Sequence, residues 1–114
     1  MHFHHKTQLD LGIVICSLHG ELIDKNQATD FIADIEKHLT AGNLKVVLDL
    51  TDLKYINSSG LNVLINILTK ARKNGGEAVV ASVSPKVKEL FVITKLNTVF
   101  TVTDSVEKAL SKLK

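Results

Sequence analysis

The chain has 114 residues, of which 45% are hydrophobic and 23% are charged, and its formal net charge at pH 7 is +2. This balance is typical of one folded domain, which we expect to span residues 1–114, and it excludes a disordered chain. Arg72 is the only arginine, and the sequence holds no dense basic run or set of stacking aromatic residues. We therefore expect no nucleic acid as a partner.

Signals for membrane insertion and secretion are also missing from the sequence. No hydrophobic run approaches the roughly 20 residues that a membrane-spanning helix needs, so we expect no membrane insertion. The first residues lack the hydrophobic segment of a signal peptide. Cys16 is the only cysteine and cannot form an internal disulfide, which suits a reducing compartment. These features predict a cytoplasmic protein.

Two strands are predicted at the N-terminus, over residues 3–9 and 13–18, with a turn between them. Cys16 lies in the second, strongly apolar run and is expected to be a small core residue. His2, His4 and His5 cannot all converge on a metal, because successive residues of a strand point to opposite faces. We expect solvated histidines and no metal site.

An amphipathic helix is predicted over residues 26–40, where apolar side chains recur at helical spacing, and it ends at Ala41-Gly42-Asn43. Asp24 stands just before it, where an acidic side chain suits the positive end of the helix dipole. Residues 44–50 are mostly apolar and rich in β-branched side chains, which predicts a central strand buried on both faces.

Residues 51–57 are expected to form a polar connection, and Ser58-Ser59-Gly60 to open a second helix. The serine pair has two explanations. A serine hydroxyl can cap a helix by accepting from the free N–H groups of its first turn. The same N–H groups and the helix dipole also favour a phosphate, so a phosphorylated serine is tolerated there.

The rest of the chain continues the alternation of strands and helices. A strand is predicted over residues 77–81, a helix beginning at Ser84-Pro85, and a short edge strand over residues 99–102. Asp104 and Glu107 resemble a capping box for a final amphipathic helix. The resulting order is ββαβαβαβα, an α/β domain with a mixed central sheet.

Patterns that mark catalysis are absent from the sequence. It contains no G-x-x-x-x-G-K-[ST] loop and no G-x-G-x-x-G, and no histidine stands near Ser58 to activate it. We therefore expect no enzyme, no catalytic residues and no cofactor. The alternative hypothesis is that the chain is an unrecognised small enzyme. In that case its melting temperature should shift when metals or nucleotides are added.

Two motifs resemble the STAS domain, the fold of bacterial anti-sigma-factor antagonists. Asp49-Leu50 followed by residues 56–61, INSSGL, is similar to a strand ending in Asp-Leu-Ser and the family motif Asp-Ser-Ser/Thr-Gly-Leu. Residues 19–24, HGELID, look like the family's Gly-Glu-Leu-Asp turn with Ile23 added. The resemblance covers nearly the whole chain. It implies a single STAS-like domain with helices packed mainly on one side of the sheet.

The resemblance also implies a function. Ser58 matches the serine that a partner kinase phosphorylates, and the implied partner-binding residues are Asp24, Asn57, Ser58, Ser59, Gly60, Leu61 and Asn62. The unphosphorylated chain, a monomer or weak dimer, would bind an anti-sigma factor that is itself a serine kinase. Phosphorylation would release it, and a phosphatase would reset this regulator of transcription.

One departure from the family pattern keeps an alternative open. The position before Ser58 is Asn57, where the family usually has Asp. This favours a non-phosphorylated STAS scaffold, or a regulatory subunit of a signalling or transporter complex. Asp24 also has two explanations, as the family's acidic residue beside the phosphorylation site or as a residue that only starts the next helix.

Overall fold

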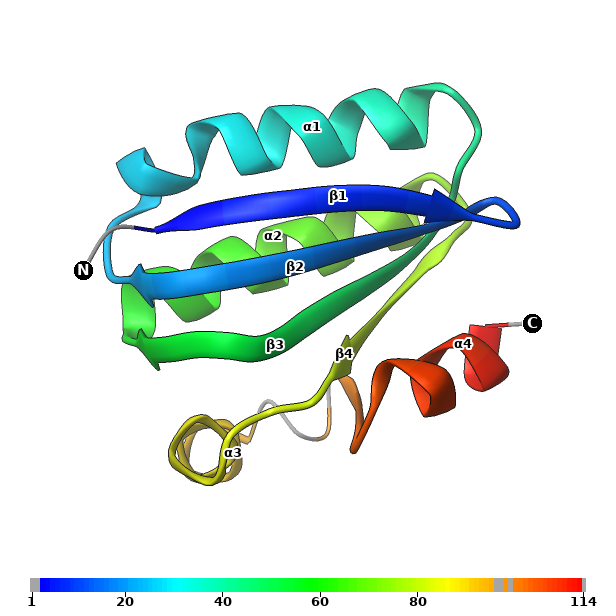
Figure 1. The fold of residues 1–114 in the computed structure, drawn as a ribbon. Helices are drawn as coiled ribbons and strands as arrows, with labels where there is room; N and C mark the ends of the chain where they lie inside the picture. The colour runs from blue at the N-terminus through cyan, green and yellow to red at the C-terminus, as the bar shows by residue number, and fades with distance from the viewer. Residues whose placement is uncertain (1–2, 96–97, 99, 114) are drawn as a thin grey trace.

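The computed structural model describes residues 3–95, 98 and 100–113 (Figure 1). In these residues the elements follow the order β1 (His4–Asp10), β2 (Ile13–Leu22), the 3-10 helix η1 (Lys25–Ala28), α1 (Thr29–Thr40), β3 (Lys45–Ile56), α2 (Ser58–Lys73), β4 (Glu77–Ala81), α3 (Pro85–Ile93), β5 (Thr101–Thr103) and α4 (Val106–Leu113). The predicted order ββαβαβαβα is confirmed. None of the helices in the described ranges is long and apolar enough to cross a bilayer.

The five strands form one mixed sheet in the order β1-β2-β3-β4-β5. β1 pairs with β2 in antiparallel fashion, and the later neighbours are parallel. Val46 and Leu48 of β3 belong to the core shared with α1, α2 and α3, whereas Val47 lies in a smaller core with α4. Because successive strand residues point to opposite faces, β3 is buried on both. The helices therefore lie mainly on one side, as predicted.

The predicted polar connection over residues 51–57 is wrong, because β3 continues to Ile56. β2 likewise extends past residue 18, so that His19 pairs with Asp52 and Leu22 with Ile56. One register shift lies between these two pairs and another lies just before His19. Leu53 and Ile56 are 1% and 2% exposed. Burial of these two side chains and pairing with the longer β2 keep residues 51–56 in the sheet. Only Asn57 separates the sheet from α2.

Two smaller boundary predictions near the C-terminus also change. The edge strand is β5 (Thr101–Thr103) rather than residues 99–102, and Val99 lies outside the described residues. The cap of α4 is not Asp104, because the Lys108 N–H donates to the Ser105 hydroxyl at 3.2 Å. Asp104 instead pairs with the Lys108 ammonium at 3.3 Å.

Of the N-terminal histidines, His4 is exposed, as the sequence suggested, whereas His5 is partly buried. His4 lies opposite His19 in the β1–β2 pair, and their rings stack with centroids 4.5 Å apart. His5 Nε2 lies 3.3 Å from a carboxylate oxygen of Asp34 on α1, because α1 covers this face of β1. His2 lies outside the described residues. In the part of the chain that the structure describes, no three potential metal ligands gather.

Two titratable groups on this side of the sheet have shifted pKa values. Burial alone would raise the pKa of Asp34, but hydrogen bonds from Thr7 and His5 and the nearby His38 lower it below its usual value. Burial raises the pKa of the Cys16 thiol to about 12, an effect that the hydrogen bond from Thr7 only partly opposes. Cys16 is fully buried, which confirms the core role predicted for it.

Candidate functional site

The segment that carries the serine pair begins where the paired ends of β2 and β3 stop. Asn57 has an extended backbone, with φ −115° and ψ −170°, and its side-chain oxygen accepts from the Gly60 N–H at 3.0 Å. This is the geometry of an N-cap residue. The expectation that a serine caps α2 is therefore wrong, since Ser58 and Ser59 occupy the first two helical positions.

Asn57 also joins α2 to the end of β2. Its side-chain Nδ2 donates to the Ile23 carbonyl oxygen at 3.0 Å, and its backbone N–H donates to the Leu22 carbonyl oxygen at 3.3 Å. An aspartate could keep the cap, because it has an acceptor oxygen in the same place, but a carboxylate has no N–H to donate. The asparagine that departs from the family pattern thus has a structural role at this junction.

Changing Asn57 tests this double role. Asn57→Ala removes both the cap and the bond to Ile23, and we expect a free energy of unfolding lower by about 2 kcal/mol. Asn57→Asp keeps the cap and is expected to lose less, since only the bond to Ile23 is removed. Urea denaturation of the wild-type chain and the two variants measures their order of stability. If the alanine variant is as stable as the wild-type chain, Asn57 does not stabilise the junction between α2 and the end of β2.

Gly60 and Leu61, both predicted to bind a partner, are buried. A Cβ atom at Gly60 would lie 2.2 Å from the Leu22 carbonyl oxygen, so the helix backbone passes directly over the end of β2. Leu61 is 3% exposed and belongs to the main core. In this structure neither residue presents a side chain to solvent. Both residues hold the first turn of α2 in place, and their predicted role in partner binding stays a prediction.

Ser58 and Ser59, by contrast, are exposed and face two different depressions. No residue of the described ranges forms a hydrogen bond with the Ser58 hydroxyl, and the Asn57 cap occupies the N–H of Gly60 but not those of the two serines. These N–H groups lie at the positive end of the helix dipole. The arrangement presents a free hydroxyl beside groups that favour an anion.

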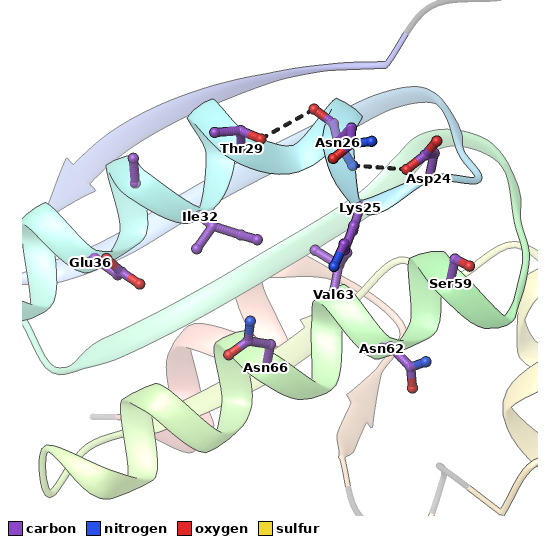
Figure 2. A pocket seen from close by; sticks show the side chains of 11 residues that line it. Asp24, Lys25, Asn26, Thr29, Ile32, Glu36, Ser59, Asn62, Val63 and Asn66 are labelled. Atoms are coloured by element: carbon purple, nitrogen blue, oxygen red, sulfur yellow. Dashed lines mark hydrogen bonds between the residues drawn. The ribbon is translucent and has the colours of Figure 1, made fainter.

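Ser59 lines a groove of about 700 Å³ between α1 and α2 (Figure 2). Asn62 and Asn66 continue along the α2 side, and Asp24, Asn26 and Thr29 lie among the residues of the opposite side. The structure therefore brings Asp24, Ser59 and Asn62 to one groove although Asp24 and Ser59 lie 35 positions apart in the sequence.

Asp24 also has a local role in this groove wall. Its carboxylate accepts from the Asn26 N–H at 2.9 Å, and the Gln27 side chain accepts from the Asp24 N–H at 3.0 Å. This reciprocal pair is a capping box for η1. The helix-starting explanation is thus confirmed, and the groove position leaves the side chain where a partner could also reach it. Its partner-binding role stays a prediction.

Ser58 lines a second, smaller hollow of about 320 Å³, between the end of β3, the start of α2 and α3. Lys54 and Tyr55 from β3 form one wall, and the α3 wall, which includes Lys86, Leu90 and Ile93, could not be predicted from the sequence. About thirty positions separate the two groups in the sequence, and no short motif links them. Only the packing of α3 beside the end of β3 brings them together.

Comparison with known proteins relates this fold and site to a family. The model of the STAS domain matches residues 5–109. BtrV of Bordetella bronchiseptica, provisionally named an anti-sigma factor antagonist, is 33% identical over 103 residues, which cover 90% of this chain and 88% of BtrV.

Solved structures agree with this match. The crystal structure of a Thermotoga maritima protein, with the same provisional name, is similar with a TM-score of 0.86 at 26% identity, covering 96% of this chain and 93% of that one. The phosphorylated form of the Bacillus cell fate determinant SpoIIAA has a TM-score of 0.73 at 18% identity, covering 98% and 99%, and supports the fold alone. The chain belongs to the STAS domain family.

Proposed function

We propose that the chain is an anti-sigma-factor antagonist that switches partners through phosphorylation of Ser58. The observation that carries the proposal is the exposed Ser58 hydroxyl at the first position of α2, beside N–H groups that favour an anion. The names of BtrV and of the Thermotoga maritima protein support the same function. SpoIIAA, which shares the fold, has been solved in a phosphorylated form.

In the proposed cycle, the unphosphorylated chain binds an anti-sigma factor that is itself a serine kinase. The kinase transfers the γ-phosphoryl group of ATP to the Ser58 oxygen, which breaks the bond to the β-phosphate and releases ADP and the hydroxyl proton. Phosphorylation adds nearly two negative charges to the contact surface, which opposes docking by repulsion and by the cost of desolvation. A phosphatase hydrolyses the phosphoserine and restores binding. The cycle operates in the cytoplasm and regulates transcription.

Little change of fold is expected on phosphorylation. The Ser58 side chain is exposed, and the negative phosphate lies at the positive end of the α2 dipole, where it does not oppose the helix. Asn57 does not argue against the switch, because its bonds to Gly60 and Ile23 explain the asparagine at that position. The alternative, a STAS scaffold without a phosphorylation step, differs in predicting no modification at Ser58.

The intact mass of the protein recovered from its own cells tests the proposal. We expect an additional mass of one phosphate that disappears after phosphatase treatment and never appears on a Ser58→Ala variant. Ser59→Ala is the matched control, since it removes the neighbouring hydroxyl, and it should still carry the phosphate. Absence of phosphate under every growth condition would favour the scaffold. Phosphate that persists on Ser58→Ala would assign the modification to another residue.

A further inference from the structure

Exposed hydrophobic side chains gather near the start of α2. Among the described residues, the large hydrophobic side chains that are exposed are Leu9, Leu11, Ile23, Tyr55, Val92 and Ile93. Leu9 and Leu11 belong to the β1–β2 hairpin at the other end of the sheet (Figure 1). Ile23 adjoins Asn57, and Tyr55 and Ile93 line the hollow beside Ser58. Such a concentration on one part of the surface is typical of an interaction site.

The hollow beside Ser58 has a hydrophobic floor and hydrophobic walls. Val87 and Ile56, 2% exposed each, close it toward the core, and the partly buried Leu90 lies beside them. Tyr55 and Ile93, which are 41% and 69% exposed, stand at the sides. A volume of about 320 Å³ is enough for one or two hydrophobic side chains of a partner. The hollow is thus built to receive an apolar group.

The rim of the hollow is positively charged. Lys54 and Lys86 lie on it, against a single acidic residue, Glu89. Within the described part of the chain neither lysine forms an ion pair, and the Lys86 ammonium lies 5.8 Å from the centre of the Tyr55 ring. A cation over an aromatic face is only weakly held at an exposed site, so this lysine is available to a stronger partner.

We propose that this hollow binds a segment of the anti-sigma factor in which an apolar side chain is flanked by Asp or Glu. The apolar side chain fills the space between Tyr55 and Ile93, and the carboxylate pairs with Lys54 and Lys86. The excess of positive charge at the rim selects an acidic segment over a basic one. The inference rests on the proposed function and specifies the part of the surface that the anti-sigma factor contacts.

The position of Ser58 on the same rim relates this contact to the switch. A phosphate on Ser58 carries the same sign of charge as the partner's carboxylate and stands beside the same two lysines. It therefore repels the acidic segment and competes with it for Lys54 and Lys86. Phosphorylation would release the partner by acting on this hollow, without any rearrangement of the sheet.

Binding of the purified anti-sigma factor kinase to the full-length chain tests the inference, with affinities measured by calorimetry. We expect Lys54→Gln, Lys86→Gln and Ile93→Ser each to weaken the affinity by about tenfold, as for central contacts of an interface. The matched controls are Lys88→Gln and Val92→Ser, which change exposed residues of the same helix α3 that do not line the hollow. The controls should bind within about twofold of the wild-type chain. Thermal melts of all five variants establish that each is folded.

Each result distinguishes the inference from the function on which it rests. Wild-type affinity in the three hollow variants would overturn the inference and leave the proposed function in place. If the wild-type chain does not bind the kinase, both the inference and the proposed function are contradicted. Anionic phospholipid vesicles that bind the wild-type chain but not the lysine variants would overturn a protein segment as the occupant. If the chain instead forms a dimer that the Ile93→Ser substitution dissociates, the occupant of the hollow is a second copy of this chain, and the inference is also overturned.

Discussion

Gly60→Ala is expected to lower the free energy of unfolding by about 2 kcal/mol or more, which for a domain of this size lowers the melting temperature by roughly 10 °C. The same change at an exposed helical position usually stabilises a protein by up to about 1 kcal/mol, because alanine is the better helix former. The sign reverses here because the added Cβ would lie 2.2 Å from the Leu22 carbonyl oxygen and 2.5 Å from a side-chain carbon of Ile56.

The neighbouring atoms at Gly60 cannot move away easily. The Leu22 carbonyl oxygen already accepts from the Asn57 N–H, and Leu22 and Ile56 pair in the sheet. To admit a methyl group, the first turn of α2 must rise from the end of β2, which disturbs the Asn57 cap and the position of Ser58. We therefore expect Gly60→Ala to weaken partner binding as well, although Gly60 itself is buried.

Thermal and urea denaturation measure this effect. Thr69→Ala is the control, because it introduces alanine at an exposed position of the same helix and should be neutral or slightly stabilising. A Gly60→Ala variant as stable as the Thr69→Ala variant would show that α2 can shift freely over β2. The first turn of α2 would then not be held in a fixed position, and this would contradict the basis of the Ser58 site.

The second large effect is expected on binding. Ser58→Asp should weaken the affinity for the anti-sigma factor kinase by about tenfold or more, with a melting temperature close to that of the wild-type chain. The aspartate places one negative charge at the rim of the hollow, close to Lys54 and Lys86. A phosphate at the same position would place nearly two negative charges there. The phosphorylated protein should therefore bind more weakly still. Because both effects are electrostatic, they should decrease as salt is added.

Two controls separate the charge at this position from other causes. Ser58→Asn has nearly the size of the aspartate without its charge, and it should retain most of the affinity. Ser111→Asp adds the same charge at an exposed position of α4, on the opposite face of the sheet, and should leave binding unchanged. If Ser58→Asp binds as tightly as the wild-type chain, the partner switch is wrong and the scaffold without a phosphorylation step becomes the better explanation.

Much of the architecture could be predicted from the sequence, because it is encoded by local patterns. The run of Val46, Val47 and Leu48 is apolar on both faces, which is the condition of a central strand, and it lies in the first part of β3. The helix predicted to open at Ser58-Ser59-Gly60 is α2, and Ser84-Pro85 is the start of α3, with the Ser84 hydroxyl accepting from the Val87 N–H.

The failures of prediction lie where distant segments meet. The serines of the motif looked like caps because serine is a good N-cap residue, but the chain stays in the sheet through Ile56, and this places Asn57 at the cap. The extension of β3 could not be foreseen because it depends on pairing with residues 19–22 of β2. His5 was expected in solvent, and it approaches Asp34 only because α1 lies over β1.

The sequence by itself determined the fold class, the order of elements and the motif that places Ser58 at the start of a helix. These properties depend on hydrophobic periodicity and on residues adjacent in the chain, which can be read without knowledge of any tertiary contact. Only the tertiary structure decided what surrounds Ser58. The groove that contains Asp24 and the lysine-rimmed hollow on α3 combine side chains from distant elements, and their charges and spacing depend on how α1, α2 and α3 pack against the sheet.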